Sequence, residues 1–205
     1  GEVLYINGNV NLNDGAVLDS DNSVFVSNDN AVLTLKPGSM VDSNVKITKS
    51  GAKLIIDATG MAAGESANIT GTVTNSGNGT IAVVGNDNLE AKIIDGKIVL
   101  VEKPVAKIGE TEYATLAEAV AAVQEGQTIQ LLAGEISEGT IKLPATLKNV
   151  TFIGAANHAS VLKDMTIMAA DGNSFNYEGL TFDGIYFNNS RISIVFFVSF
   201  FGLVR

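Results

Sequence analysis

The chain of 205 residues contains no cysteine and no tryptophan, and its single histidine is His158. Without cysteine, disulfide frameworks, thiolate zinc sites, iron–sulfur clusters and cysteine nucleophiles are all excluded. One histidine, in a stretch that is typical of a loop, predicts neither a His-based metal cluster nor a catalytic triad. These absences remove most common routes to metal-dependent and nucleophilic catalysis.

Positive charge is also scarce, since 13 Lys and Arg stand against 22 Asp and Glu, for a net charge of −9. Only Arg191 and Arg205 are arginines. Nucleic-acid binding needs a concentration of basic residues, so we expect no nucleic-acid partner. The longest hydrophobic stretch, 192–204, has 13 residues, whereas a membrane-spanning helix needs about 20. We therefore expect no membrane span.

A repeat of twenty-odd residues is present, and it is the main signal in the chain. Residues 10–20, 33–43 and 54–62 each read as a short alternating strand, a Gly-centred turn and further strand-like sequence. One such block cannot bury its own apolar face, so successive blocks stack as coils. With 21 Gly and only 3 Pro, the composition suits many turns between ordered strands. We predict an all-β parallel solenoid.

Two domains are expected, with the boundary at Lys103-Pro104. Residues 1–103 hold the solenoid repeats and end in a hairpin, because two apolar runs flank Asp95-Gly96 and Asp-Gly favours the type I′ turn. Residues 104–205 open with a small hairpin at 105–113. The capping box Thr115–Glu118 then starts a helix near 115–125, with Gly126 placed to end it. Short strands follow, so the second domain is also predicted to be a solenoid.

The second domain resembles a known family. Three segments carry the resemblance: AKIGETEYATLAEAVAAVQEGQTIQLLAGEI (106–136), KNVTFIGA (148–155) and YEGLTFDGIYFNNSRI (177–192). They are similar to pectin-lyase-like right-handed parallel β-helices of large bacterial surface proteins, and the first half resembles adhesin-type β-solenoid repeats. The resemblance implies a right-handed coil, and a secreted or cell-surface location for which no signal peptide is present in this chain. It also implies more coils than fit here, so we expect either a second domain that is truncated or one that ends abruptly in the Phe-rich stretch.

Some members of this group cleave acidic polysaccharides, and the residues offer two candidate carboxylates for such chemistry. Asp164 and Asp183 are the weak catalytic candidates, since glycoside hydrolysis needs a pair about 5 Å apart for retention or about 6.5–9.5 Å for inversion. Asp183-Gly184 also reads as an ordinary turn. Enzymatic activity is therefore the less favoured interpretation.

The acidic stretch that begins at Asp19 suggests a weak calcium site. The glycine and glutamate that an EF-hand loop requires are replaced by Val24 and Asn30, so that motif is rejected. Asp19, Asp21 and Asp42 could still coordinate calcium loosely between coils. No other cofactor is implied.

The uncharged C-terminal stretch is a candidate interaction surface, because exposed apolar edges seek partners. Its interaction candidates are Phe196, Phe197, Phe200 and Phe201, which predict a homodimer through this edge. The leading hypothesis is a non-enzymatic, secreted or cell-surface bacterial module that acts as a stalk or adhesion surface for a host or cell-wall glycan or protein. The alternatives are a carbohydrate-binding or carbohydrate-active β-helix and a self-association module.

Overall fold

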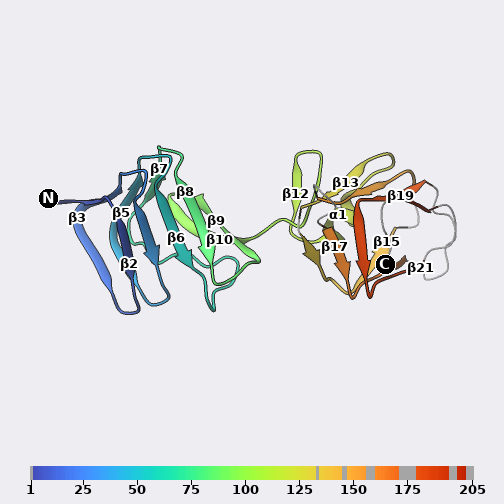
Figure 1. The fold of residues 1–205 in the computed structure, drawn as a ribbon, viewed down its shortest axis with the longest axis horizontal. Coiled ribbons are helices and arrows are strands. Elements are labelled where there is room, and N and C mark those ends of the chain that lie inside the picture. The colour runs from blue at the N-terminus through green and yellow to red at the C-terminus, as the bar shows by residue number, and fades with distance from the viewer. Residues whose placement is uncertain are drawn as a thin grey trace. The chain divides into compact units, whose positions relative to one another are not determined.

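The computed structural model describes residues 2–132, 134–144, 147–155, 160–170 and 179–193, and the backbone of 198–201. Stacked parallel sheets form a β-solenoid of about seven turns, with one short helix in this part of the chain. By their contacts the residues fall into two compact units, 1–103 and 104–205. Figure 1 colours unit 1 from blue to green and unit 2 from yellow-green to red. Each unit is stabilised by a separate buried apolar cluster.

Unit 1 stacks its coils through two four-stranded parallel sheets, in the orders β1-β3-β5-β7 and β2-β4-β6-β8. A short extra ladder joins the first part of β3 to β5 and continues in the isolated bridge between Val41 and Ile69. Inward residues alternate with outward ones, as a half-buried strand requires. The strands are β1 (Val3–Ile6), β2 (Asn9–Leu12), β3 (Val17–Val26), β4 (Val32–Leu35), β5 (Met40–Ile47), β6 (Lys53–Asp57), β7 (Val73–Asn75) and β8 (Thr80–Val84).

The strand register confirms the repeat that the sequence predicted. Val10 pairs with Leu33, and Leu33 pairs with Leu54, so the first residues of the three repeat blocks lie on one line. Asp19 likewise pairs with Asp42. The register then shifts, because residues 20–22 of β3 lie opposite Ser43 alone. The repeat therefore corresponds to physical coils, with a bulge where the first coil passes into the second.

A hairpin closes one end of unit 1. It is formed by β9 (Leu89–Ile94) and β10 (Lys97–Glu102), which pair antiparallel around Asp95 and Gly96. Both turn residues have positive φ, 49° and 76°, as the expected type I′ turn requires. Strand β10 also bonds to the last coil, where Ala67 N–H donates to Ile98 C=O over 3.0 Å. The hairpin thus pairs with one side of the last coil, whereas β7 and β8 remain the edge strands of their sheets.

Unit 2 has three-sided coils, with parallel sheets β13-β16-β19-β22, β14-β17-β20 and β15-β18-β21. An antiparallel hairpin, β11 with β12, precedes the first coil, and β11 pairs antiparallel with β13. The elements are β11 (Ala106–Ile108), β12 (Thr111–Tyr113), α1 (Leu116–Ala122), β13 (Thr128–Leu131), β14 (Glu135–Ile136), β15 (Thr140–Leu143), β16 (Thr151–Ile153), β17 (Ser160–Lys163), β18 (Thr166–Ala169), β19 (Leu180–Asp183), β20 (Ile185–Asn188), β21 (Arg191–Ser193) and β22 (Val198–Phe201).

Helix α1 begins as predicted and ends earlier than predicted. Thr115 Oγ1 accepts from Glu118 N–H over 3.1 Å, and the Glu118 carboxylate accepts from Thr115 N–H over 3.3 Å, which confirms the capping box. The helix stops at Ala122, because Val123 is already extended at φ −65° and ψ 142°. Gly126, at φ 78°, lies in the turn before β13 and does not end the helix.

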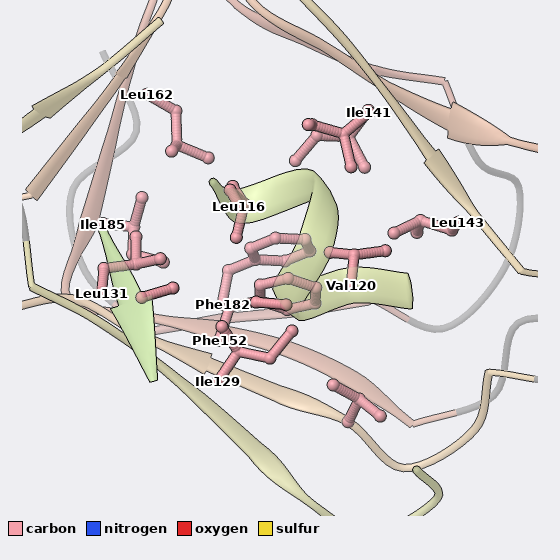
Figure 2. Packing of buried hydrophobic residues seen from close by; sticks show 14 of the residues in the cluster. Leu116, Val120, Ile129, Leu131, Ile141, Leu143, Phe152, Leu162, Phe182 and Ile185 are labelled. Carbon is pink, nitrogen blue, oxygen red and sulfur yellow. The ribbon is translucent and has the colours of Figure 1, made fainter. Parts of the chain in front are cut away.

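The helix packs its apolar face onto the first coil of unit 2. Leu116 and Val120 are buried in the same cluster as Phe152 and Phe182, and Figure 2 shows the two phenyl rings stacked beside the helix. Phe152 lies in β16, and its register partner Phe182 lies in β19, one coil further along. The apolar column of this unit is therefore continuous from the capping helix through successive coils.

Candidate functional site

The two catalytic candidates lie at different corners of unit 2. Asp183 ends β19, and its carbonyl accepts from Gly154 N–H over 2.8 Å. Asp164 follows β17, and its carboxylate accepts from the amide of Asn189 over 2.6 Å. The whole of β20 separates Asp183 from Asn189 along the coil. The register therefore does not bring the two carboxylates onto one line of the solenoid.

Asp164 occupies a turn position that needs a left-handed backbone. Its φ is 52°, and its equivalent on the next coil, Asn189, has φ of 48°. Gly, Asn and Asp are the residues that tolerate this conformation. An open depression lies beside this corner, lined by Asp164, Met165, Thr166, Asn189, Ser190 and Arg191. The turn explains the residue types at this corner without invoking chemistry.

Two of the three calcium candidates come together. Asp19 and Asp42 are register partners on β3 and β5, whereas Asp21 lies in the bulge that follows. The Asp42 carboxylate accepts from the hydroxyl of Thr70 over 2.6 Å. Across the described ranges, no three Asp, Glu or His side chains gather as a group that could hold a metal ion. The calcium site stays a prediction.

The aromatic candidates of the C-terminal stretch fall largely outside the described residues. Phe196 and Phe197 lie outside them altogether. Phe200 and Phe201 belong to β22, whose backbone pairs in parallel with β19, but their side chains are not among those described. The predicted interaction surface is untested by this structure.

A row of three outward side chains crosses adjacent coils of unit 1. Tyr5, Phe25 and Lys46 are register partners on β1, β3 and β5 and share the outward face of that sheet. The Tyr5 and Phe25 rings stack with centroids 5.2 Å apart and planes 28° from parallel. Lys46 Nζ lies 5.1 Å from the Phe25 ring centroid, within the range of a cation–π contact. We call these three residues the Tyr5 row.

The sequence holds four tyrosines that could in principle stack on sugars, Tyr5 among them, but it does not single out Phe25 or Lys46. Each of the three residues sits between two inward apolar residues of its strand, as in Leu4-Tyr5-Ile6 and Val45-Lys46-Ile47. The signal that could have found the row was therefore the shared position within the repeat. The bulge at residues 20–22 hides it, because it lengthens one coil just before Phe25.

The first coil carries a second exposed feature next to the Tyr5 row. A shallow depression is lined by Glu2, Val3, Leu4, Asp19, Ser20 and Asp21. Ser20 Oγ donates to the carbonyl of Glu2 over 3.0 Å, which ties the bulge to the start of β1. The carboxylates of Glu2, Asp19 and Asp21 are exposed around Val3 and Leu4. We call these three residues the acidic rim.

Comparisons of the chain with protein-family models, with curated proteins and with solved structures give no match. The fold class is therefore argued from the strand pairing alone, and the candidate site is argued from the contacts of its side chains. In the described part of the chain, no helix is long and apolar enough to span a membrane.

Proposed function

We propose that this chain is a non-enzymatic β-solenoid module of a secreted or cell-surface bacterial protein, acting as a stalk segment and an adhesion surface. The observation that carries the proposal is the Tyr5 row, in which an exposed tyrosine, a half-buried phenylalanine and a lysine continue across three coils. A solenoid suits this role because its neighbouring coils repeat the same outward positions. The ligand is a glycan or a protein of the host or of a cell wall.

The family assignment belongs to the same proposal. We propose that residues 106–192 are a pectin-lyase-like β-helix segment and that unit 1 is of the adhesin type. The opening hairpin, the capped helix and the three-sided coils of unit 2 support the first part. The acidic balance and the polar outward residues of unit 1 support the second.

A carbohydrate-binding β-helix is the second candidate function, and the Tyr5 row favours it. Aromatic rings present large, rigid, half-polar contact surfaces, and here two of them are stacked on an outward face. Carbohydrate cleavage, the catalytic form of this candidate, would require a paired carboxylate site, for which Asp164 and Asp183 are poorly placed. Binding is therefore the form of this function that the geometry supports.

The experiment that separates these functions is a glycan-array screen of the full chain, with and without calcium, followed by analysis of the bound glycans for shorter products. The non-enzymatic module predicts unchanged glycans and no calcium dependence. Product formation that is abolished in Asp164→Asn or Asp183→Asn would overturn it in favour of an enzyme. An unchanged product yield in Thr34→Val would confirm that such a loss is specific to those carboxylates.

Self-association through the C-terminal stretch remains a separate proposal, motivated by its uncharged Phe-rich sequence. It predicts a dimer in sedimentation that Phe197→Lys converts to monomer. A monomeric wild-type chain at high concentration would reject it.

A further inference from the structure

The sheet β2-β4-β6-β8 keeps one unbroken register along a side of unit 1. Leu33 pairs with Leu54, and Leu54 pairs with Ile81, with no shift between them. Figure 1 shows β2, β6 and β8 of this sheet on one side of the unit. Strands β4 and β6 lie between other strands, so this surface is a side of the solenoid and not one of its ends. Equivalent outward residues therefore stand in straight rows across the coils.

These outward residues form three rows, and we call the surface that they make the β6 face. The middle row consists of Asn11, Thr34, Ile55 and Ala82, one flanking row of Asn9, Val32, Lys53 and Thr80, and the other of Lys36, Asp57 and Val84, where Lys36 follows the end of β4. Half-buried apolar side chains thus alternate with charged ones on this face.

The charged groups of β6 have capacity for a further partner. In the described part of the chain, no ion pair joins Lys53 or Asp57 to another residue. The Thr59 hydroxyl and amide both donate to Oδ1 of Asp57, and a carboxylate has a second oxygen that can accept from a cation. Lys53 is exposed, so its ammonium can reach a group outside the chain.

The outward residues of β6 are complementary to themselves. Lys53 lies two residues before Ile55, and Asp57 lies two residues after it. When a second copy faces β6 in the antiparallel direction with Ile55 opposite Ile55, Lys53 of each copy faces Asp57 of the other. A twofold axis always produces such a reciprocal pair of contacts, and opposite charges across an interface favour this register over others.

The neighbouring strands fit the same arrangement. On β4, Thr34 faces its counterpart, and Val32 faces the aliphatic stem of Lys36, which can cover apolar surface. On β8, Ala82 faces its counterpart. No residue of these strands is placed directly opposite a residue of the same charge, so the face as a whole matches a second copy of itself.

We propose that the β6 face joins two copies of this chain face to face, related by a twofold axis that runs along the middle row. Lys53 of each copy pairs with Asp57 of the other, and the two Ile55 side chains pack together on the axis. A face with both charge signs, placed symmetrically about an apolar centre, matches itself better than it matches a ligand of one charge sign. The inference goes beyond the proposed function and does not depend on it.

The size of the face predicts how strongly the copies associate. Four strands about 4.8 Å apart, each with about five residues at a rise of about 3.4 Å, give a face of roughly 300 Å². A standard interface buries about 800 Å² on each partner. We therefore expect a weak dimer that forms at high chain concentration. Salt should weaken it further, because the ion pairs lie near solvent.

Cross-linking tests the arrangement directly, because the chain contains no cysteine. Ile55→Cys places one thiol opposite another, so mild oxidation should give a covalent dimer at least about fivefold faster than in Thr74→Cys, an exposed outward position of the other sheet. Lys53→Cys and Asp57→Cys should each cross-link slowly alone. A mixture of these two variants should cross-link rapidly, because their thiols face each other.

Charge reversal tests the ion pair in sedimentation experiments without cysteine. Lys53→Glu should weaken association by at least about fivefold, because the new carboxylate faces Asp57 of the second copy. Lys49→Glu changes the net charge equally at an exposed corner and should leave association unchanged. The double variant Lys53→Glu with Asp57→Lys reverses the pair and should restore association. Circular dichroism of each variant checks that the solenoid is intact.

Several results would overturn the inference. These are equal cross-linking rates for Ile55→Cys and Thr74→Cys, equal association of Lys53→Glu and Lys49→Glu, and a monomeric wild-type chain at the highest attainable concentration. Loss of the Ile55→Cys cross-link when Phe197→Lys is added would assign the association to the C-terminal stretch instead. Glycan binding by a monomeric chain that Lys53→Glu abolishes would assign the β6 face to a glycan.

Discussion

Phe152 and Phe182 lie on adjacent coils of unit 2 and stack with ring centroids 4.7 Å apart and planes 11° from parallel. This separation equals the spacing of neighbouring strands in a sheet, about 4.8 Å. Both rings are almost fully buried, at 1% and 2% exposure. The ladder of strands therefore sets the stacking distance, and the stacked rings in turn fill the core between coils.

We predict that Phe182→Ala destabilises unit 2 by about 3–5 kcal/mol, the usual cost of removing a buried phenyl ring. Phe182→Leu keeps much of the volume and should cost less. Urea unfolding followed by circular dichroism measures both, with hydrogen exchange in β16 and β19 as the local readout. Val84→Ala, at an exposed position of unit 1, serves as the control. Equal midpoints for Phe182→Ala and the control would contradict the assigned packing.

Glu138 holds the start of helix α1 from a distant part of the chain. Its carboxylate accepts from Leu116 N–H over 2.6 Å and from Ala117 N–H over 3.0 Å. The first amides of a helix have no partner within it, and negative charge is favourable there. Together with the capping box, Glu138 satisfies amides that would otherwise depend on water.

We predict that Glu138→Ala destabilises unit 2 by about 1–2 kcal/mol, as loss of a charged helix cap does. Glu138→Gln keeps one acceptor and should lose less. Hydrogen exchange at Leu116 and Ala117 should accelerate in both variants. Glu110→Ala removes an exposed glutamate of the preceding turn and provides the matched control. If the two amides exchange at the wild-type rate in Glu138→Ala, the cap is not formed in solution.

Local signals predicted the architecture well. The repeat gave the coil register at Val10, Leu33 and Leu54, and the motifs at Thr115–Glu118 and Asp95-Gly96 gave the capped helix and the hairpin. Each is a short-range pattern whose backbone geometry follows from a few neighbouring residues.

Features that depend on the lengths of corners were not predictable. Whether Asp164 and Asp183 meet depends on how many residues each turn between strands contains. A turn with a different number of residues places the following side chains on a different strand position of the coil. The helix cap from Glu138 could not be predicted from a local motif, because Glu138 is 22 residues from Leu116 in the sequence. The bulge before Phe25 conceals the Tyr5 row, because it breaks the regular spacing of the repeat. A solenoid therefore shows its coils in sequence more readily than the alignment of its surface residues.

Lys97 closes the corner between the last coil of unit 1 and the hairpin. Its ammonium donates to the carbonyls of Ile69, Thr70 and Gly71 over 3.1, 2.6 and 2.8 Å. Three donors matched to three carbonyls use the full capacity of an ammonium group. The Lys97 side chain thus holds residues 69–71 of the last coil against the β9–β10 hairpin.

We predict that Lys97→Met destabilises unit 1 by about 1–3 kcal/mol, because hydrogen bonds to a charged group are stronger than neutral ones. Lys92→Met, in the same hairpin, is the matched control. Lys92 pairs with Glu90 over 2.9 Å at a half-exposed surface, and such pairs contribute about 0–1 kcal/mol. Thermal unfolding of both variants gives the comparison. A larger loss for Lys92→Met than for Lys97→Met would reject this role of Lys97.

Asp57 and Thr59 form a local turn that should make part of the stability of unit 1 depend on pH. The Thr59 hydroxyl donates to Asp57 Oδ1 over 2.7 Å, and the Thr59 amide donates to the same oxygen over 3.1 Å. The hydroxyl bond, followed by the amide bond and the more distant Lys36, lowers the pKa of Asp57 below its ordinary value of 3.8. A carboxyl whose pKa is lower in the folded state contributes stability above its unfolded pKa and loses it as pH falls through the folded pKa.

We predict that Thr59→Val raises the pKa of Asp57 toward its ordinary value, because the hydroxyl donor is removed while the amide bond stays. The variant should lose about 0.5–1 kcal/mol near neutral pH, the usual contribution of one hydrogen bond. The loss should shrink at a pH below the lowered pKa of Asp57 in the folded wild type, where the carboxyl of wild type and variant alike is protonated. NMR titration of the Asp carboxyl carbons measures the pKa, and urea unfolding at the two pH values measures stability. Thr34→Val makes the same substitution on an outward position of β4 and should leave the Asp57 titration unchanged. A pH-independent stability difference between Thr59→Val and wild type would show that the hydroxyl acts through packing rather than through the carboxylate.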